Sequence, residues 1–131
     1  MNPRVAAIIL DKEKILLMYR FRVGEEYYTL LGGSIEENEN LEQALVREIK
    51  EESNLEISGL EFLWQFDNRG REDNYFLVKN FSGELKLGEP ELSRQNENNK
   101  YIPTWVNLSD LKDIDLRPVE VKEKILEKFV K

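Results

Sequence analysis

Three glutamates, Glu48, Glu51 and Glu52, stand at positions i, i+3 and i+4 of a segment whose apolar residues recur at helical spacing. An α-helix turns by about 100° per residue, so the three carboxylates fall within an arc of about 100° on one helix face. Close like charges raise one another's pKa and destabilise a fold unless cations neutralise them. Carboxylate oxygens are hard ligands, so the cluster predicts a site for Mg²⁺, with Mn²⁺ or Ca²⁺ as alternatives.

The same run has a simpler explanation, because Glu-rich helices often carry i,i+4 ion pairs on a solvated face. On the helix alone that explanation is favoured, but the surrounding residues fit the metal site. Gly32 and Gly33 lack a Cβ, so their backbone can approach a ligand or metal closely. Arg47 lies beside the cluster and can pair with Glu51 one turn on or reach back to Glu39.

Composition narrows the chemistry further. The chain has no Cys and no His, which excludes thiol nucleophiles, zinc fingers, iron–sulfur sites and imidazole bases. The 26 acidic and 19 basic residues give a formal net charge of −7, and this balance disfavours nucleic acid and membrane surfaces as partners. The apolar stretch Val5–Leu10 is too short for a membrane span or a secretory signal, so we expect a cytoplasmic protein.

The length and the order of elements predict one domain over residues 1–131, of α/β (α+β) class with a mixed β-sheet between helices. Asn40 and Gln43 form a capping box for a helix over Leu41–Ser53, and Pro118 suits the first turn of a helix over Val119–Val130. The expected strands are Val5–Leu10, Ile15–Arg20, Tyr27–Leu31, Leu60–Phe66, Tyr75–Lys79, Phe81–Leu87 and Tyr101–Val106. Polar loops are expected at 32–39, 67–74 and 88–100.

The glycine, the arginine and the glutamates together form a longer pattern, Gly33-x5-Glu39-x7-Arg47-Glu48-Ile49-x-Glu51-Glu52-x-Asn54-Leu55. It closely resembles the Nudix box, G-x5-E-x7-R-E-U-x-E-E-x-G-U with U apolar, and the order of the surrounding elements extends the resemblance over nearly the whole chain. Asn54 replaces the last Gly, at a left-handed cap where Asn is the best substitute. Leu31 stands where the family often has Pro. Neither change touches a carboxylate.

The resemblance implies a Mg²⁺-dependent hydrolase, with Mn²⁺ as a second option. Nudix enzymes typically cleave the pyrophosphate linkage of a nucleoside diphosphate derivative by attack of water on phosphorus. The substrate is then a small nucleotide: a nucleoside triphosphate (ordinary or oxidised), a nucleotide sugar such as ADP-ribose, or a dinucleoside polyphosphate. A metal is needed because two unit charges 4 Å apart repel by about 4 kcal/mol at an effective dielectric constant of 20, and both substrate and carboxylates are anionic.

By the same resemblance Glu48, Glu51 and Glu52 bind the metal, and the carbonyl of Gly32 completes its shell. The family is not uniform on whether the first or the second of these glutamates deprotonates the attacking water, and we favour Glu48. Arg47 and Glu39 are expected to orient the helix against the preceding loop.

Other contacts are expected from outside the helix. In several Nudix members an acidic residue of the loop before the late strand joins the metal, and here Glu97 is the first candidate and Glu91 the second. Arg20 and Arg22 follow the second strand and can hold phosphates, while Tyr28 can stack on a base. The ordinary alternatives are solvated charges for the four ionic residues and core packing for the tyrosine.

Three other functions were weighed. A nucleotide sensor with a Nudix fold is expected to lose box carboxylates, and this chain keeps all of them. The isoprenoid diphosphate isomerases of the family rely on a Cys that is absent here. RNA decapping is disfavoured by the acidic balance, although net charge does not reveal a local basic groove. Many relatives are dimers, so a homodimer is one option for the assembly.

Overall fold

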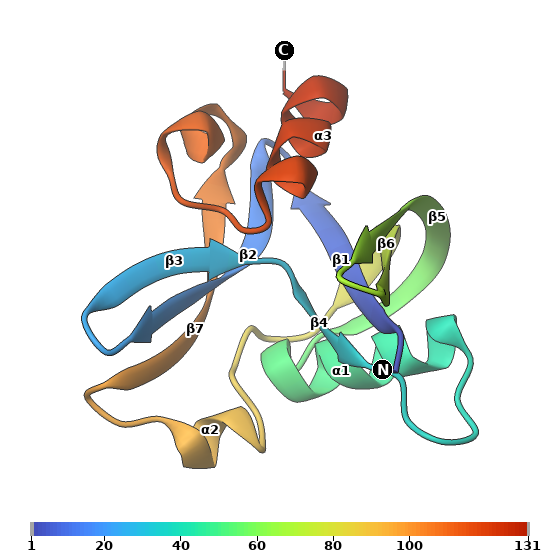
Figure 1. Cartoon of the computed structure of the whole chain (residues 1–131), viewed down its shortest axis with the longest axis horizontal. Helices are drawn as coiled ribbons and strands as arrows, with labels where there is room; N and C mark the ends of the chain where they lie inside the picture. Colours follow the sequence, from blue (N-terminus) through green and yellow to red (C-terminus); the bar gives the residue numbers. More distant parts are fainter. Residues whose placement is uncertain (1, 131) are drawn as a thin grey trace.

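The computed structural model describes residues 2–130, and it arranges them around one seven-stranded mixed sheet (Figure 1). The strands are β1 (Arg4–Asp11), β2 (Lys14–Arg22), β3 (Glu25–Thr29), β4 (Leu31–Ser34), β5 (Glu56–Asn68), β6 (Arg71–Ser82) and β7 (Asn99–Asn107). The helices are α1 (Leu41–Ser53), α2 (Glu91–Arg94), the 3₁₀ helix η1 (Leu108–Asp113) and α3 (Val119–Phe129).

Strand β1 is the centre of the sheet. It runs parallel to β6 and antiparallel to β4, with Val5 opposite Gly33. Its far end pairs with β2, which in turn carries β3 and β7 on its two sides. A strand with neighbours on both sides and helices above and below must be apolar on both faces, which explains the unbroken Val5–Leu10 run.

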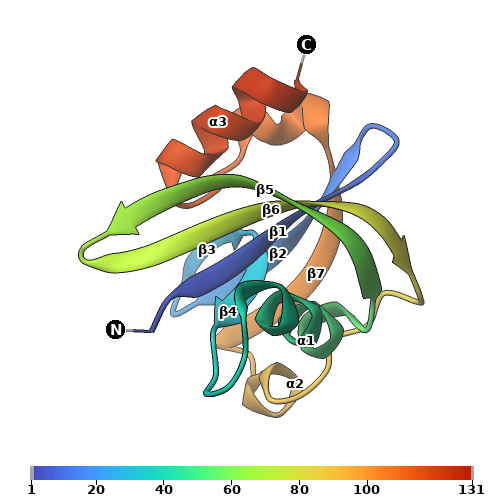
Figure 2. The ribbon, with the colours of Figure 1, turned by 90° about the vertical axis from the view of Figure 1, so that its right-hand side faces the viewer.

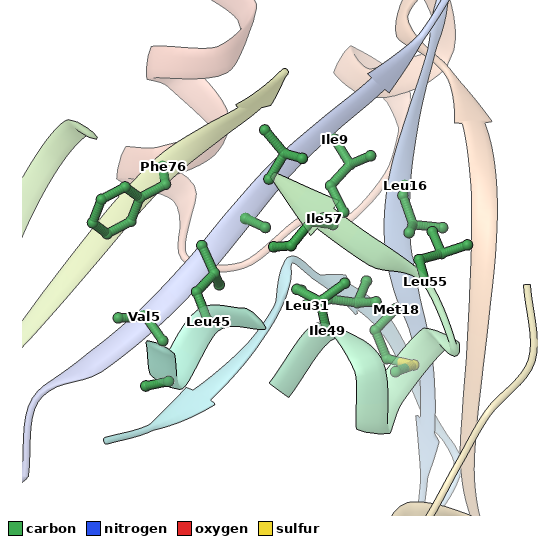
Figure 3. Close-up of a cluster of buried hydrophobic side chains, with 13 residues drawn as sticks. Val5, Ile9, Leu16, Met18, Leu31, Leu45, Ile49, Leu55, Ile57 and Phe76 are labelled. Atoms are coloured by element: carbon green, nitrogen blue, oxygen red, sulfur yellow. The ribbon is translucent and has the colours of Figure 1, made fainter. Parts of the chain in front are cut away.

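Two apolar cores lie on opposite faces of this sheet, one under α1 and the other under α3 (Figure 2). Leu45 and Ile49 of α1 pack with Val5, Leu31 and Met18 in the first core (Figure 3). Val121 and Ile125 of α3 pack with Ile8, Ile15 and Leu17 in the second. This is the mixed sheet between helices that the sequence predicts.

Helix α1 begins and ends at the predicted residues. The Asn40 side chain accepts a hydrogen bond from the backbone N–H of Gln43 at 2.8 Å, and the Gln43 side chain accepts one from the N–H of Asn40 at 2.9 Å. Asn54 adopts the left-handed conformation at the other end, with φ of 68°. The capping box and the left-handed cap are therefore both confirmed.

Several predicted boundaries are wrong. Gly32 and Gly33 belong to strand β4 rather than to a loop, because β1 supplies hydrogen-bond partners for them. The polar stretch 67–74 extends β5 and β6 into a long hairpin that turns at Arg69-Gly70. The strand predicted at Phe81–Leu87 is absent beyond Ser82, and the predicted loop 88–100 contains α2 and the start of β7.

Within residues 2–130, none of the helices is both long and apolar enough to cross a membrane.

Candidate active site

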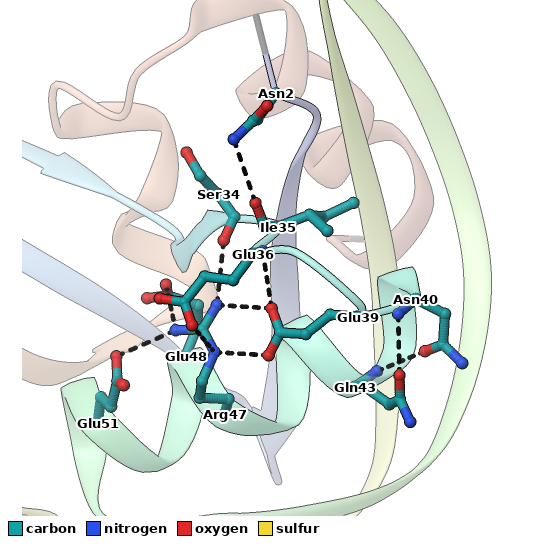
Figure 4. Close-up of polar contacts among 10 residues, drawn as sticks. All are labelled: Asn2, Ser34, Ile35, Glu36, Glu39, Asn40, Gln43, Arg47, Glu48 and Glu51. Carbon is teal, nitrogen blue, oxygen red and sulfur yellow. Dashed lines mark hydrogen bonds and ion pairs between the residues drawn. The ribbon is translucent and has the colours of Figure 1, made fainter.

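Arg47 of α1 is the hub of the polar contacts around the acidic helix face (Figure 4). Its Nε and Nη2 donate to the two carboxylate oxygens of Glu39 at 2.7 and 2.9 Å, and Nη2 also donates to the Ser34 carbonyl at 3.1 Å. These bonds raise the pKa of Arg47 and lower the pKa of Glu39. The ion pair ties the loop between β4 and α1 to the helix, which is the orienting role the sequence predicts for both residues.

The remaining donor of Arg47 faces the acidic cluster. Nη1 donates to Glu48 Oε1 at 2.9 Å and to Glu51 Oε2 at 3.3 Å (Figure 4). The guanidinium of Arg47 therefore neutralises part of the charge of three carboxylates, those of Glu39, Glu48 and Glu51. Nη1 contacts one oxygen of each carboxylate, so each glutamate keeps a second oxygen that a cation could take.

Glu52 is the most deeply buried carboxylate of the cluster. Only 8% of the residue is exposed, and its Oε1 accepts a hydrogen bond from the backbone N–H of Gly32 at 2.7 Å. Burial raises the pKa of Glu52 well above its ordinary value, and the nearby charges of Glu48 and Glu91 raise it further. The Gly32 hydrogen bond and the charge of Arg4 oppose that shift without cancelling it. A carboxylate in this position favours a nearby cation.

Glu48 lies against the second glycine of β4. A Cβ on Gly33 would stand 2.3 Å from the carboxyl carbon of Glu48, and a Cβ on Gly32 would stand 2.0 Å from the carbonyl oxygen of Val5. The two glycines thus let β4 fit between β1 and the carboxylates of α1. Burial raises the pKa of Glu48, although its contact with Arg47 offsets part of the effect.

Glu91, the first residue of α2, lies near the same carboxylates although it comes from a distant part of the chain. The segment before it is hydrogen-bonded to the last turn of α1, where the N–H groups of Lys86 and Gly88 donate to the carbonyls of Ser53 and Glu51, both at 2.8 Å. Glu91 Oε1 is buried and has no hydrogen-bond partner within residues 2–130. An unpaired buried acceptor costs about 1–3 kcal/mol, so this oxygen indicates a missing partner, and a cation is the chemistry that suits it.

These groups line one cleft of about 540 Å³. Arg20 also lines it, with its guanidinium 3.7 Å from the ring centroid of Tyr101 and Nη1 donating to the Lys100 carbonyl at 2.8 Å. These contacts hold Arg20 on the wall of the cleft, and no carboxylate among residues 2–130 is paired with it. The further lining residues with polar side chains are Arg4, Tyr27, Thr29, Ser34, Glu36 and Arg94.

The structure brings together most of the predicted site. Arg20, Gly32, Arg47, Glu48, Glu51 and Glu52 line the cleft, and Glu39 stands behind Arg47. Three other candidates are not among the residues that line it.

Arg22 is exposed at the end of β2, and Glu97 is exposed in the turn before β7. Tyr28 packs in the core under α3, with its ring 5.5 Å from that of Tyr19. Tyr27 lines the cleft because it pairs with Arg20 across β2 and β3 and so shares its face. Only the strand register decides which of two adjacent tyrosines faces the cleft.

Among the described residues, no three acidic side chains are already gathered closely enough to hold a metal ion. The donor set nevertheless fits a hard divalent cation, because the half-buried Glu48 and the buried Glu52 have raised pKa values and Glu91 has an oxygen without a partner among the described residues. The residues present thus have the right chemistry, and Arg47 is bonded to Glu48 and to the neighbouring Glu51.

Comparison with known proteins agrees with the box and the fold. A family model described as NUDIX domain matches residues 1–129. The NAD-capped RNA hydrolase NudC of Salmonella agona is 31% identical over 113 residues, which are 83% of this chain and 40% of that protein. The chain thus spans about 40% of the length of the curated relatives it matches.

Two solved structures have a similar fold. One, from a study of MutT from Aliivibrio salmonicida and Vibrio cholerae, has a TM-score of 0.78 at 25% identity and covers 98% of both chains. The other, the solution structure of the E. coli ORF135 protein, has a TM-score of 0.70 at 27% identity, covering 98% of this chain and 91% of that one.

Proposed function

This chain belongs to the Nudix family, and from that premise we propose that it is a Mg²⁺-dependent hydrolase of the pyrophosphate linkage in a nucleoside diphosphate derivative. The observation that carries the proposal is the arrangement of Glu48, Glu52 and Glu91 around one cleft. Glu48 is half-buried and Glu52 is buried, both with raised pKa values, and Glu91 has a buried oxygen for which residues 2–130 supply no partner. These carboxylates repel a phosphate chain unless cations are bound first.

Glu48, Glu51, Glu52 and Glu91 are the side chains that would hold the metal, with the carbonyl of Gly32 as the ligand that the family resemblance adds. When bound, Mg²⁺ polarises phosphoryl oxygens and lowers the pKa of coordinated water. We assign Mg²⁺ because it suits sites made of carboxylates and phosphates, and Mn²⁺ is its usual substitute.

Glu48 is our choice for the general base. Its carboxylate is half-buried beside Gly33, and burial raises its pKa toward the range in which a carboxylate accepts a proton effectively. Arg47 holds Glu48 in place through Nη1 and holds the preceding loop through Glu39. Arg20, fixed over Tyr101, is placed to bind a phosphate oxygen of the substrate.

The substrate remains one of the nucleotide classes that the family resemblance implies. A relative acts on NAD-capped RNA and a structural neighbour is a MutT protein, so both a dinucleotide linkage and a nucleoside triphosphate belong in the test. Nucleotide sugars and dinucleoside polyphosphates complete the panel.

The experiment incubates the purified chain with each substrate, with and without Mg²⁺, and resolves the nucleotide products by chromatography. We expect Mg²⁺-dependent release of a nucleoside monophosphate from at least one class. Glu51→Gln should reduce that turnover by more than about 100-fold, whereas Glu42→Gln, an exposed change on the first turn of the same helix, should leave it unchanged. Tight nucleotide binding without cleavage of any substrate would instead indicate a sensor and contradict the proposal.

A further inference from the structure

Helix α2 carries Glu91 to the cleft but has little packing of its own. It is four residues long, none of them is buried as a whole, and none belongs to either apolar core of residues 2–130. Figure 1 shows α2 at the margin of the molecule, beside the chain that leads into β7. Hydrogen bonds at its two ends must therefore set its position, and the segment before it is bound to α1 through Gly88.

The other end of α2 is bound by Asn99, the first residue of β7. Asn99 Nδ2 donates to the carbonyl of Arg94, the last residue of α2, at 3.1 Å. The backbone of Asn99 also exchanges two hydrogen bonds with that of Asn96, at 3.0 and 3.1 Å, which close the turn between the two elements. Gln95 adds a further bond, because its Oε1 accepts from the Tyr101 N–H at 2.9 Å. The end of α2 is thus joined to β7.

The other polar atom of the same amide contacts Arg20. Asn99 Oδ1 accepts a hydrogen bond from Arg20 Nη1 at 3.1 Å, and Nη1 also donates to the Lys100 carbonyl at 2.8 Å. Both acceptors engage one nitrogen of the guanidinium. The Nε and Nη2 groups have no hydrogen-bond partner among residues 2–130, so they are left to bind a phosphate.

A side-chain amide suits these two contacts. A guanidinium only donates and a carbonyl only accepts, so the group between Arg20 and Arg94 has to offer an acceptor and a donor side by side. An aspartate at this position would lack the donor, and an apolar residue would lack both. Asn99 is half-buried and is not among the residues that line the cleft. Its amide therefore acts on neighbouring residues and not on a ligand.

We propose that Asn99 is a positioning residue that couples Glu91 to Arg20, because its one amide joins the end of α2 to the guanidinium on the cleft wall. The inference rests on the proposed function for the role of Glu91 with the cation and of Arg20 with a phosphate. If α2 moves, Asn99 moves with it and Arg20 loses an acceptor, so both ligands of the cleft are misplaced together. A residue that contacts neither ligand thus keeps the two binding groups in one geometry.

Binding measurements without turnover test this role. Mn²⁺ binding is followed by electron paramagnetic resonance. Binding of methylenediphosphonate, an uncleavable pyrophosphate analogue, is followed by calorimetry with Mn²⁺ saturating. Asn99→Ala removes both side-chain bonds and should weaken the binding of each ligand by about threefold to tenfold, the range expected for loss of a hydrogen bond.

Asn98→Ala is the matched control. Asn98 is the exposed neighbour of Asn99, and its side chain makes no hydrogen bond with the other described residues. This variant should bind Mn²⁺ and methylenediphosphonate as tightly as wild type.

Double-mutant cycles distinguish positioning from a general loss of structure. In a Glu91→Gln background, Asn99→Ala should change Mn²⁺ affinity by less than about twofold, because the residue through which it acts is gone. In an Arg20→Gln background, it should change methylenediphosphonate affinity equally little. A variant that is merely destabilised would lose affinity in both backgrounds, and thermal melting of each variant checks that it is folded.

Loss of both affinities in Asn99→Ala, absent from the two backgrounds, supports the coupling. The inference alone is overturned if Asn99→Ala keeps either affinity, if Asn98→Ala loses as much, or if the losses persist in the two backgrounds. A wild-type chain that binds no Mn²⁺ or no methylenediphosphonate contradicts the proposed function, and the inference falls with it.

Discussion

At the scale of single residues, the cleft is built from groups that destabilise the metal-free protein. Glu52 is buried and accepts one backbone hydrogen bond, and Glu91 has a buried oxygen that no described residue contacts through a hydrogen bond. Among the described residues, Arg47 neutralises part of the charge of Glu48 and Glu51 but is not paired with Glu52 or Glu91. Buried charge of this kind is costly unless it is paired, which agrees with the proposal that these residues bind cations.

Glu52→Gln tests this cost directly. The amide keeps an oxygen that can accept the Gly32 N–H but removes the buried charge, so the metal-free variant should be more stable than wild type at neutral pH, on the order of 1 kcal/mol. Chemical denaturation measures the difference. The same variant should lose Mg²⁺-dependent turnover, and a variant that keeps nearly full activity would remove Glu52 from the metal site.

The two glycines of β4 should respond differently to a methyl group. In Gly33→Ala the new Cβ meets the end of a side chain, the carboxyl of Glu48, so the fold should survive with Glu48 displaced and activity reduced. In Gly32→Ala it meets the backbone of β1, which cannot move easily, so stability should fall by about 1–3 kcal/mol. Thermal melts and kinetics of both variants check this, and equal stability losses would contradict the assignment.

At the scale of elements, the C-terminal end of α1 also binds the loop that follows β6. Its last carbonyls, which have no partners within a helix, accept hydrogen bonds from Lys86 and Gly88. The Asn54 side chain adds a bond to the Glu84 carbonyl at 2.9 Å. The loop after β6 is thereby held across the helix terminus, and the chain reaches α2 with Glu91 directed into the cleft.

Gly88→Ala should disturb this attachment. A Cβ there would stand 2.4 Å from the Glu51 carbonyl oxygen, so the loop must shift and carry Glu91 away from the cleft. We expect weaker Mn²⁺ binding by calorimetry with the sheet intact.

Asn54→Gly is the matched comparison at the same helix terminus. Glycine tolerates the left-handed conformation, so the stability of this variant should differ from wild type by less than about 1 kcal/mol, and its activity should persist. Loss of turnover in that variant would reveal a further role for Asn54.

At the scale of the whole molecule, the sheet separates two cores and carries the cleft at the edge where β1, β3 and β4 meet α1. The chain is acidic overall, with a formal net charge of −7, yet the walls of the cleft include Arg4, Arg20 and Arg94. Net charge therefore understates how well this surface accepts an anion. The arrangement concentrates opposite charges in one place, so stability should depend on pH and on divalent cations together.

This dependence has a definite sign. The pKa values of Glu48 and Glu52 are raised in the folded state above their ordinary value of 4.5. Between that value and the raised ones the folded chain binds more protons than the unfolded chain, so metal-free stability should fall as pH rises through this window. Urea denaturation from pH 4.5 to 7.5 measures it, and Mg²⁺ should restore stability at the upper end. The pKa of Glu39 is lowered, so its contribution to stability changes only at pH values below its ordinary pKa, outside this window.

The amino-acid sequence by itself predicted the features that depend on residues close together in the chain. The capping box, the bounds of α1, the left-handed cap at Asn54 and the shared face of the three glutamates all follow from spacing within one helix. The mixed sheet between helices follows from the order of apolar segments. The pairing of Arg47 with Glu39 was expected from the family pattern, which contains both residues, although Glu39 lies in the loop before the helix.

Tertiary structure alone decided which distant residues meet the acidic face. Gly32 and Gly33 form a strand only because β1 pairs with them, and Tyr27 rather than Tyr28 faces the cleft because of the register of β3 on β2. Glu91 enters the cleft because its loop is bound to the end of α1. Hydrogen bonds between segments far apart in the chain set these positions, and no local pattern of residue types records them.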